Sequence, residues 1–98
     1  MNDPRVQARI QQANREEERL KRHLPVAAIL RGVQRDEVVR YAKSEVQRWR
    51  QQSLCSQDYV DSWEQLLSEP LRAAAVLEER SPFARRLRQN TPFAAYLR

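Results

Sequence analysis

The chain has 98 residues and a net charge of +5, with one cysteine, one histidine and one glycine. One cysteine excludes an internal disulfide, and together with one histidine it excludes a zinc site of the usual four-ligand kind. One glycine excludes a glycine-rich phosphate loop and disfavours strands joined by tight turns. We therefore expect a small all-α protein, in a single domain, that is not an enzyme of an ordinary type and needs no cofactor.

The location of the protein is predicted from what its sequence lacks. No apolar run approaches the roughly 20 residues of a membrane helix, and the first residues lack the apolar stretch of a secretion signal. We expect a cytoplasmic protein with no membrane partner, in which the thiol of Cys55 stays reduced.

The first helix is predicted over residues 3–23. Asp3 is a good N-cap, and Pro4 suits the first helical position, where no N–H is needed. The helix should end before Pro25, because a proline disfavours helical geometry at the residue before it. This break divides the chain into an N-terminal helical arm, residues 1–24, and a small domain, residues 25–98. His23 would then lie at a helix C-terminus, where its charge complements the helix dipole.

The apolar residues of this arm recur at spacings of four and three, as in a heptad seam. Glu17 occupies one seam position, and the others are Val6, Ile10, Ala13, Leu20 and Leu24. Three repeats are marginally stable alone in water. The seam is therefore a candidate self-association surface, and a structural helical oligomer is one of the functions that the sequence allows.

Three more helices are predicted in the middle of the chain. A short apolar turn over residues 25–30 should end at Gly32, the natural place for a helix C-cap or a sharp bend. The second helix, residues 34–52, buries one stripe: Val38, Val39, Ala42, Val46 and Trp49. The third, residues 57–68, buries another: Tyr59, Val60, Trp63, Leu66 and Leu67. Pro70 starts a fourth helix over residues 71–79, which should face the core through Leu71, Ala74, Ala75 and Leu77.

A motif that occurs twice forms the C-terminal tail, residues 81–98. Ser81-Pro82-Phe83 and Thr91-Pro92-Phe93 each combine an N-cap hydroxyl with a proline at the first helical position. They predict two short helical turns that present aromatic and arginine side chains, the composition of interface hot spots. The candidate partner-binding residues are Phe83, Arg85, Arg86, Arg88, Phe93, Tyr96 and Arg98.

Charge is segmented along the chain. Residues 81–98 carry +4 with no acidic residue, whereas residues 56–80 carry −4. Asp58, Asp61 and Glu64 recur every third residue on one side of the third helix. Two readings stay open: the tail docks on this acidic stripe, or its arginines face an external partner.

A weak helix-turn-helix pattern offers another function. Ala28, Gly32 and Val38 have the spacing of the small residue, turn glycine and apolar residue of that motif. It would span residues 24–43, with the recognition helix starting near Arg35. The candidate nucleic-acid-binding residues are Arg35, Arg40 and Lys43, and a DNA-binding regulator is the alternative function.

One stretch carries a resemblance. From Asp58-Tyr59 through Trp63 and Leu66-Leu67 to Leu87-Arg88-Gln89-Asn90-Thr91-Pro92-Phe93, the chain resembles short bacterial proteins found beside toxin genes. The resemblance implies an antitoxin-like or regulatory role and carries over no residue roles. We therefore expect a non-enzymatic bacterial regulator that binds a protein partner, such as a toxin or another enzyme, and covers an anionic site on it with the tail arginines.

Overall fold

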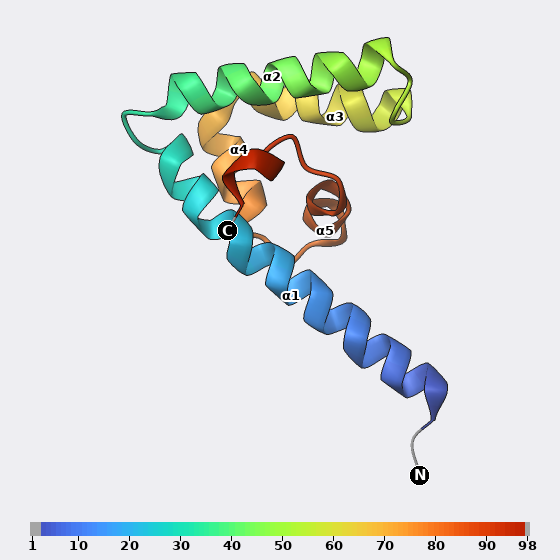
Figure 1. Cartoon of the computed structure of the whole chain (residues 1–98). Helices are drawn as coiled ribbons and strands as arrows, with labels where there is room; N and C mark the ends of the chain where they lie inside the picture. Colours follow the sequence, from blue (N-terminus) through green and yellow to red (C-terminus); the bar gives the residue numbers. More distant parts are fainter. Residues whose placement is uncertain (1–2, 98) are drawn as a thin grey trace.

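A long first helix, α1 (Pro4–Leu30), runs from a projecting N-terminal end into the middle of the molecule (Figure 1). The computed structural model of the protein describes residues 3–97. The remaining elements are α2 (Arg35–Gln51), α3 (Gln57–Leu67), α4 (Pro70–Leu77), α5 (Pro82–Gln89) and a 3-10 helix, η1 (Ala94–Tyr96). Residues 3–97 contain no strand, so the all-α prediction is confirmed, with five α-helices in place of about four. None of these helices is long and apolar enough to cross a membrane.

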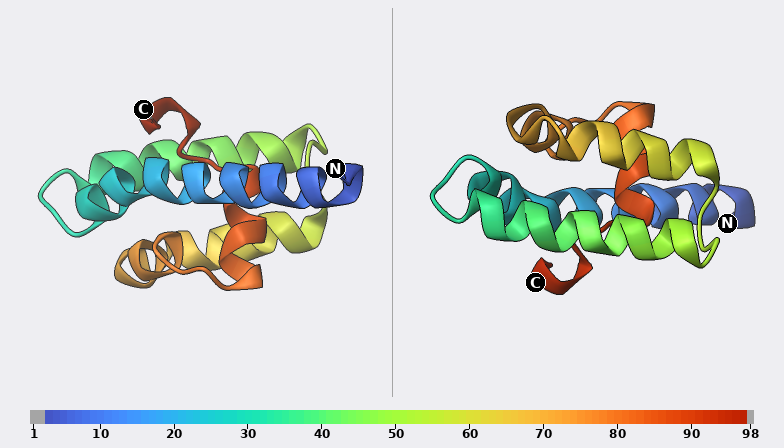
Figure 2. Two further views of the ribbon diagram at one scale, coloured as in Figure 1. Left: turned by 90° about the horizontal axis from the view of Figure 1, so that it is seen from below. Right: turned by 90° about the horizontal axis from the view of Figure 1, so that it is seen from above.

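The helices pack in pairs around one core. α2 lies along α3, the C-terminal half of α1 packs against α4, and α5 contacts both α1 and α4. The C-terminal turn lies on the side of the molecule that carries α2 (Figure 2). The radius of gyration is 14.6 Å, against about 12.6 Å for a compact domain of this length. The difference arises because the N-terminal half of α1 projects from the domain.

The core contains most of the residues that the sequence pattern selects. The predicted stripes of α2 and α3 are buried at every position. The prediction for α4 is wrong at two positions, because Leu71 and Ala75 are exposed while Ala73 and Val76 are buried. α4 packs against both α1 and α3, and its buried surface is therefore wider than one stripe and turned from the predicted direction.

The predicted helix break before Pro25 is wrong, as is the separate apolar turn over residues 25–30. Helix α1 continues through Pro25 to Leu30. A proline in a helix interior costs about 3 kcal/mol relative to alanine. Beyond it, Val26, Ala27 and Leu30 are fully buried, and burying a Val or Leu side chain contributes about 1.5–3 kcal/mol each. Burial therefore outweighs the proline, and the arm and the core share one helix.

Replacing Pro25 with alanine is expected to stabilise the protein. Pro25 is exposed, so the change restores a backbone N–H to the helix without removing buried contacts. The gain of about 3 kcal/mol in the helix is offset by about 0.4–1 kcal/mol, because the unfolded chain becomes more flexible. Urea denaturation followed by circular dichroism should show a higher midpoint for Pro25→Ala, and an unchanged or lower midpoint would contradict this account.

The predicted N-caps Asp3 and Ser81 are confirmed, and Ser56 is a third N-cap. The Asp3 side chain accepts a hydrogen bond from the N–H of Arg5 at 2.9 Å at the start of α1. Ser56 caps α3 and Ser81 caps α5 in the same way, at 3.3 and 3.2 Å. These caps satisfy N–H groups that have no partner inside their own helix.

The sequence predicts Gly32 at a helix C-cap or a sharp bend, and Gly32 lies in the bend that follows α1, directly after the C-cap residue Arg31. Among residues 3–97 no glycine has a positive φ, whereas Ser53 does, at 52°. The N–H of Leu54 donates to the carbonyl oxygen of Trp49 at 2.9 Å, and that of Ser53 to the carbonyl oxygen of Arg50 at 3.4 Å. This is the Schellman arrangement that ends α2, with serine in the position that usually favours glycine.

Candidate interaction surfaces of the tail and the arm

The two copies of the tail motif have different environments. Phe93 is fully buried and packs edge-on against Trp63, with ring centroids 5.6 Å apart. Phe83 is 43% exposed. The N–H of Phe93 donates to the Thr91 hydroxyl at 3.1 Å, and the predicted second helical turn is the 3-10 helix η1. Phe83 is therefore available to a partner, and Phe93 belongs to the core.

Arg88 is also internal, in contrast to its predicted place on a partner-binding surface. It is 3% exposed, and its Nη1 lies 3.3 Å from the carbonyl oxygen of Val76 and 3.2 Å from that of Leu77. These carbonyls end α4, where the helix dipole is negative and the last C=O groups need donors. Burial lowers the pKa of Arg88. The side chain thus caps α4 from α5 and fixes the two helices relative to each other.

The remaining predicted tail residues contact the domain from its surface. Arg85 lies 3.5 Å from a carboxylate oxygen of Glu16. The guanidinium of Arg86 stands over the ring of Tyr59, 5.5 Å from its centroid. Tyr96 packs edge-on against Tyr41 at 5.3 Å, while Arg98 lies outside the described residues.

The tail is therefore docked on its own domain, but without an ion pair to the acidic stripe of α3 within residues 3–97. Asp61 and Glu64 of that stripe pair with Arg50 of α2 instead, at 2.6 and 3.0 Å.

Tyr59 holds the end of α5 in place. Its hydroxyl lies 2.9 Å from the carbonyl oxygen of Leu87 and 2.5 Å from that of Asn90. Burial raises the pKa of Tyr59, so the hydroxyl keeps its proton and can donate it to these carbonyls. Tyr59 of α3 thus caps the end of α5, and Arg88 of α5 caps the end of α4.

The predicted seam of α1 is divided between two environments. Val6 and Ile10 are 49% and 51% exposed, and Ala13 is exposed as well. Leu20 is 4% exposed and lies in the core, while Leu24 is 43% exposed. A free apolar face therefore remains on the projecting part of α1, residues 4–15. From here on, the arm means these residues and no longer the predicted arm of residues 1–24.

The three cations predicted to read DNA differ in exposure and contacts. Arg35, the first residue of α2, is half-buried, and its Nε donates to the carbonyl oxygen of Leu30 at the end of α1 at 2.6 Å. Arg40 and Lys43 are exposed on α2. Arg35 is thus part of the helix junction, and two of the three side chains remain accessible.

His23 lies in the middle of α1 and is fully buried, so the prediction of a helix-end position is wrong. Its Nδ1–H donates to the carbonyl oxygen of Arg19 at 2.6 Å. Its Nε2 is buried and has no hydrogen-bond partner among residues 3–97. Burial, and to a smaller extent the charge of Arg88, lowers the pKa of His23, and the ring is neutral in the folded protein near pH 7.

Acidification below pH 6.5 should therefore weaken the fold through His23. The unfolded chain takes up this proton near the ordinary pKa of about 6.5, whereas the folded chain takes it up only at lower pH. The contribution of neutral His23 to the free energy of unfolding is therefore fully present above pH 6.5. Between pH 6.5 and the lowered pKa of His23, the free energy of unfolding falls by up to about 1.4 kcal/mol per pH unit. Urea denaturation at pH 7.0, 6.0 and 5.0 should show this slope for the wild type and not for His23→Gln.

A slope that persists in His23→Gln would assign the pH dependence to other groups. The carboxyls with a lowered pKa act in a different range. Arg80 holds the pKa of Glu17 down, and Arg31 does the same for Glu78, both through side-chain hydrogen bonds. Their contributions are present above the ordinary carboxyl pKa of 4.5 and are lost only as the pH falls below it.

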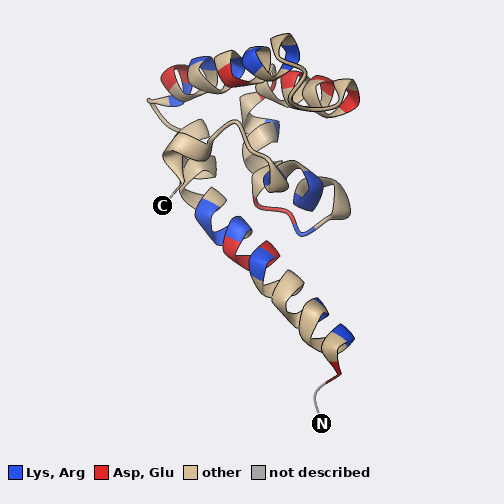
Figure 3. Ribbon diagram, turned by 45° about the vertical axis from the view of Figure 1, so that its right-hand side comes forward, with Lys and Arg blue, Asp and Glu red and all other residues tan. Residues whose placement is uncertain are grey.

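Five arginines of α1 form no salt bridge within residues 3–97: Arg5, Arg9, Arg15, Arg19 and Arg22. Sequence reasoning missed this set, although the spacing of the last three (four residues, then three) places them on one helix face. Figure 3 shows the cations along α1, with its acidic residues confined to Asp3 and one stretch near the middle.

A cluster of metal-ligating side chains, meaning three or more His, Cys, Asp or Glu placed to bind a metal, is not found in the part of the chain that the structure describes. Cys55 is half-buried, and the side-chain amide of Asn90 donates to its sulfur at 3.1 Å. The geometry is that of a small all-α protein with a projecting helical arm. Comparisons with protein-family models, with curated proteins and with solved structures find no significant match.

Proposed function

We propose that this chain is a non-enzymatic bacterial regulator that binds and controls a protein partner, as antitoxins do, and that the arm is its contact element. The observation that carries the proposal is the free apolar face of Val6, Ile10 and Ala13 on a helix that projects from the domain. An amphipathic helix that docks its apolar face into a groove is a common mode of protein recognition.

The chemistry of the arm indicates which kind of groove it fits. Arg5 and Arg9 flank the apolar face, and Asp3 beside the arm is the one acidic residue in this part of the described chain. Two arms of this kind would bring like charges together, and the three apolar side chains Val6, Ile10 and Ala13 alone offer little area for a stable dimer. We therefore place the arm in an apolar groove with an acidic rim on a different protein.

The tail arginines, proposed from the sequence to cover the partner's site, are less suited to that task. Arg88 is buried and Arg85 is paired with Glu16. Phe83 remains exposed at the surface and is the tail residue best placed to extend the contact.

The test compares two double variants of equal charge. Val6→Asp/Ile10→Asp alters the apolar face, and Gln11→Asp/Gln12→Asp alters exposed positions on the other side of the same helix. A partner captured from the native host is purified, and its affinity is measured by calorimetry. We expect the first variant to lose at least about tenfold in affinity, because burial of each apolar side chain contributes about 1.5–3 kcal/mol, and the second to bind like the wild type.

Two results would contradict this function. One is equal binding by both double variants. The other is light scattering that shows a wild-type dimer and a monomeric Val6→Asp/Ile10→Asp variant, since the seam would then serve the helical oligomer that the sequence also allows.

A further inference from the structure

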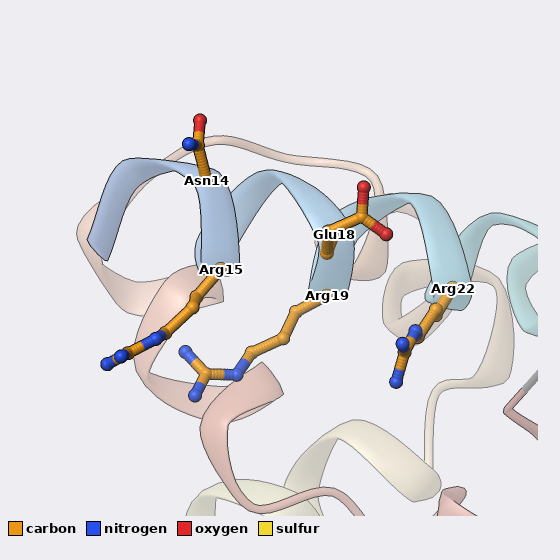
Figure 4. A pocket seen from close by; sticks show the side chains of 5 residues that line it. All are labelled: Asn14, Arg15, Glu18, Arg19 and Arg22. Atoms are coloured by element: carbon orange, nitrogen blue, oxygen red, sulfur yellow. The ribbon is translucent and has the colours of Figure 1, made fainter. Parts of the chain in front are cut away.

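Three arginines line a concavity on α1 at the base of the arm. Arg15, Arg19 and Arg22 span seven residues, or about 10.5 Å along the helix axis. Together with Asn14 and Glu18 they border a hollow of about 350 Å³. In Figure 4 the three arginines extend to one side of the helix, and Asn14 and Glu18 extend to the other.

These arginines lack internal counter-charges within residues 3–97. Glu16 and Glu17 lie next to them in sequence but pair with Arg85 and Arg80 of the domain, at 3.5 and 2.7 Å. Glu18 lies 4.0 Å from Lys21. The Nη1 of Arg19 is buried without a hydrogen-bond partner, so this guanidinium lies partly against the domain, whereas Arg15 and Arg22 are exposed.

The stripe lies opposite the apolar face of the arm. At 3.6 residues per turn, Arg15, Arg19 and Arg22 fall within about 60° of one another around the helix. Val6, Ile10 and Ala13 also fall within about 60°, on the side about 180° away. The stripe is therefore a second surface, which a ligand can occupy while a protein holds the apolar face.

We propose that the stripe of Arg15, Arg19 and Arg22 binds the backbone phosphates of a nucleic-acid duplex. Guanidinium groups donate paired hydrogen bonds that match phosphate oxygens. Arg5 and Arg9 add unpaired charges toward the tip of the arm, turned from the stripe toward the apolar face, so the cations wind over about 26 Å of helix. Such a row suits a polymer with regularly repeated charges, and the exposed amides of Gln11 and Gln12 are further donors for phosphate.

Other ligands fit the stripe less well. A protein interface has an apolar centre depleted of charge, and the stripe has none. A second copy offers only five of its thirteen carboxylates without an ion pair within residues 3–97, because the other eight are paired with its own basic side chains. Single strands bind through aromatic stacking, and α1 contains no Phe, Tyr or Trp.

The test measures the anisotropy of labelled 20-base-pair DNA and RNA duplexes with the full chain, from 50 to 200 mM salt. Arg15→Gln/Arg22→Gln removes two exposed charges of the stripe, and Arg40→Gln/Lys43→Gln removes two exposed charges of α2 as a matched control. We expect the stripe variant to lose at least about tenfold in affinity at 150 mM salt. Its slope of log affinity on log salt should fall by about 1.8, or 0.9 per lost contact. Arg15→Lys/Arg22→Lys, which keeps the charge, should retain most of the affinity.

Three outcomes would overturn the proposal. The first is no duplex binding by the wild type at 150 mM salt. The second is an equal or greater loss in the α2 variant, which would transfer the contact to the predicted helix-turn-helix. The third is displacement of the duplex by polyglutamate as readily as by unlabelled duplex, since the stripe would then accept any acidic chain. None of these outcomes bears on the proposed protein-binding role of Val6 and Ile10, which the Val6→Asp/Ile10→Asp variant tests separately.

Discussion

Phe93→Ala is expected to destabilise the protein by about 3–5 kcal/mol, the usual cost of removing a buried phenylalanine side chain. Phe93 is fully buried against Trp63, so the truncation leaves a cavity beside the largest side chain of the core. A domain of this kind has a total stability of about 5–15 kcal/mol. Thermal or urea denaturation should therefore show a large fall in the midpoint, or no folded state at 37 °C.

The other copy of the motif supplies the control. Phe83→Ala changes the same residue in the same sequence context, Ser/Thr-Pro-Phe-Ala, but at a site that is 43% exposed. Its cost should stay below about 1 kcal/mol, as for most surface substitutions. Similar losses for the two variants would mean that the second motif does not pack into the core as described.

Arg88→Ala is expected to cost about 2–4 kcal/mol. The substitution removes charge-assisted hydrogen bonds, each worth about 1.5–3 kcal/mol. It leaves the carbonyl oxygen of Leu77 without this donor, while that of Val76 still accepts from the N–H of Glu79 at 3.1 Å. It also removes buried packing by the methylene stem of the arginine. Urea denaturation of the purified variant measures this loss directly.

Arg86→Ala is the matched control for Arg88→Ala. Arg86 is exposed, and its contact with the Tyr59 ring is worth about 0.5–1 kcal/mol at such a site. If Arg88→Ala were no more destabilising than Arg86→Ala, the cap on α4 would not contribute to the fold. This pair also bears on the sequence-based function, since a variant of Arg85, Arg86 and Arg88 together would lose partner binding by unfolding.

Core positions were predicted correctly from the sequence where a helix buries a single face. The stripes of α2 and α3 follow from amphipathic spacing alone, and the caps Asp3, Ser56 and Ser81 follow from local backbone chemistry. These signals lie within a few residues of the feature that they predict, and tertiary contacts reinforce them.

Prediction failed where distant segments decide the outcome. The two copies of the tail motif look alike, and only the position of Trp63 determines that Phe93 is buried and Phe83 is not. Pro25 would end a solitary helix, yet the packing of Val26 and Leu30 carries α1 through it. Arg88 appears in sequence as one of several tail arginines, and it becomes internal because α4 ends beside it.

Because α1 is one continuous helix, hydrogen exchange along it can locate a bound ligand. Backbone amides of residues 4–15 can exchange with solvent by fraying of the exposed end, whereas those after Leu20 need the core to open. Hydrogen exchange should therefore fall steeply along this one helix, from its tip to Leu30. A molecule held at the tip would slow exchange over the first turns and leave the protected half of α1 unchanged, so its binding position can be read along a single helix.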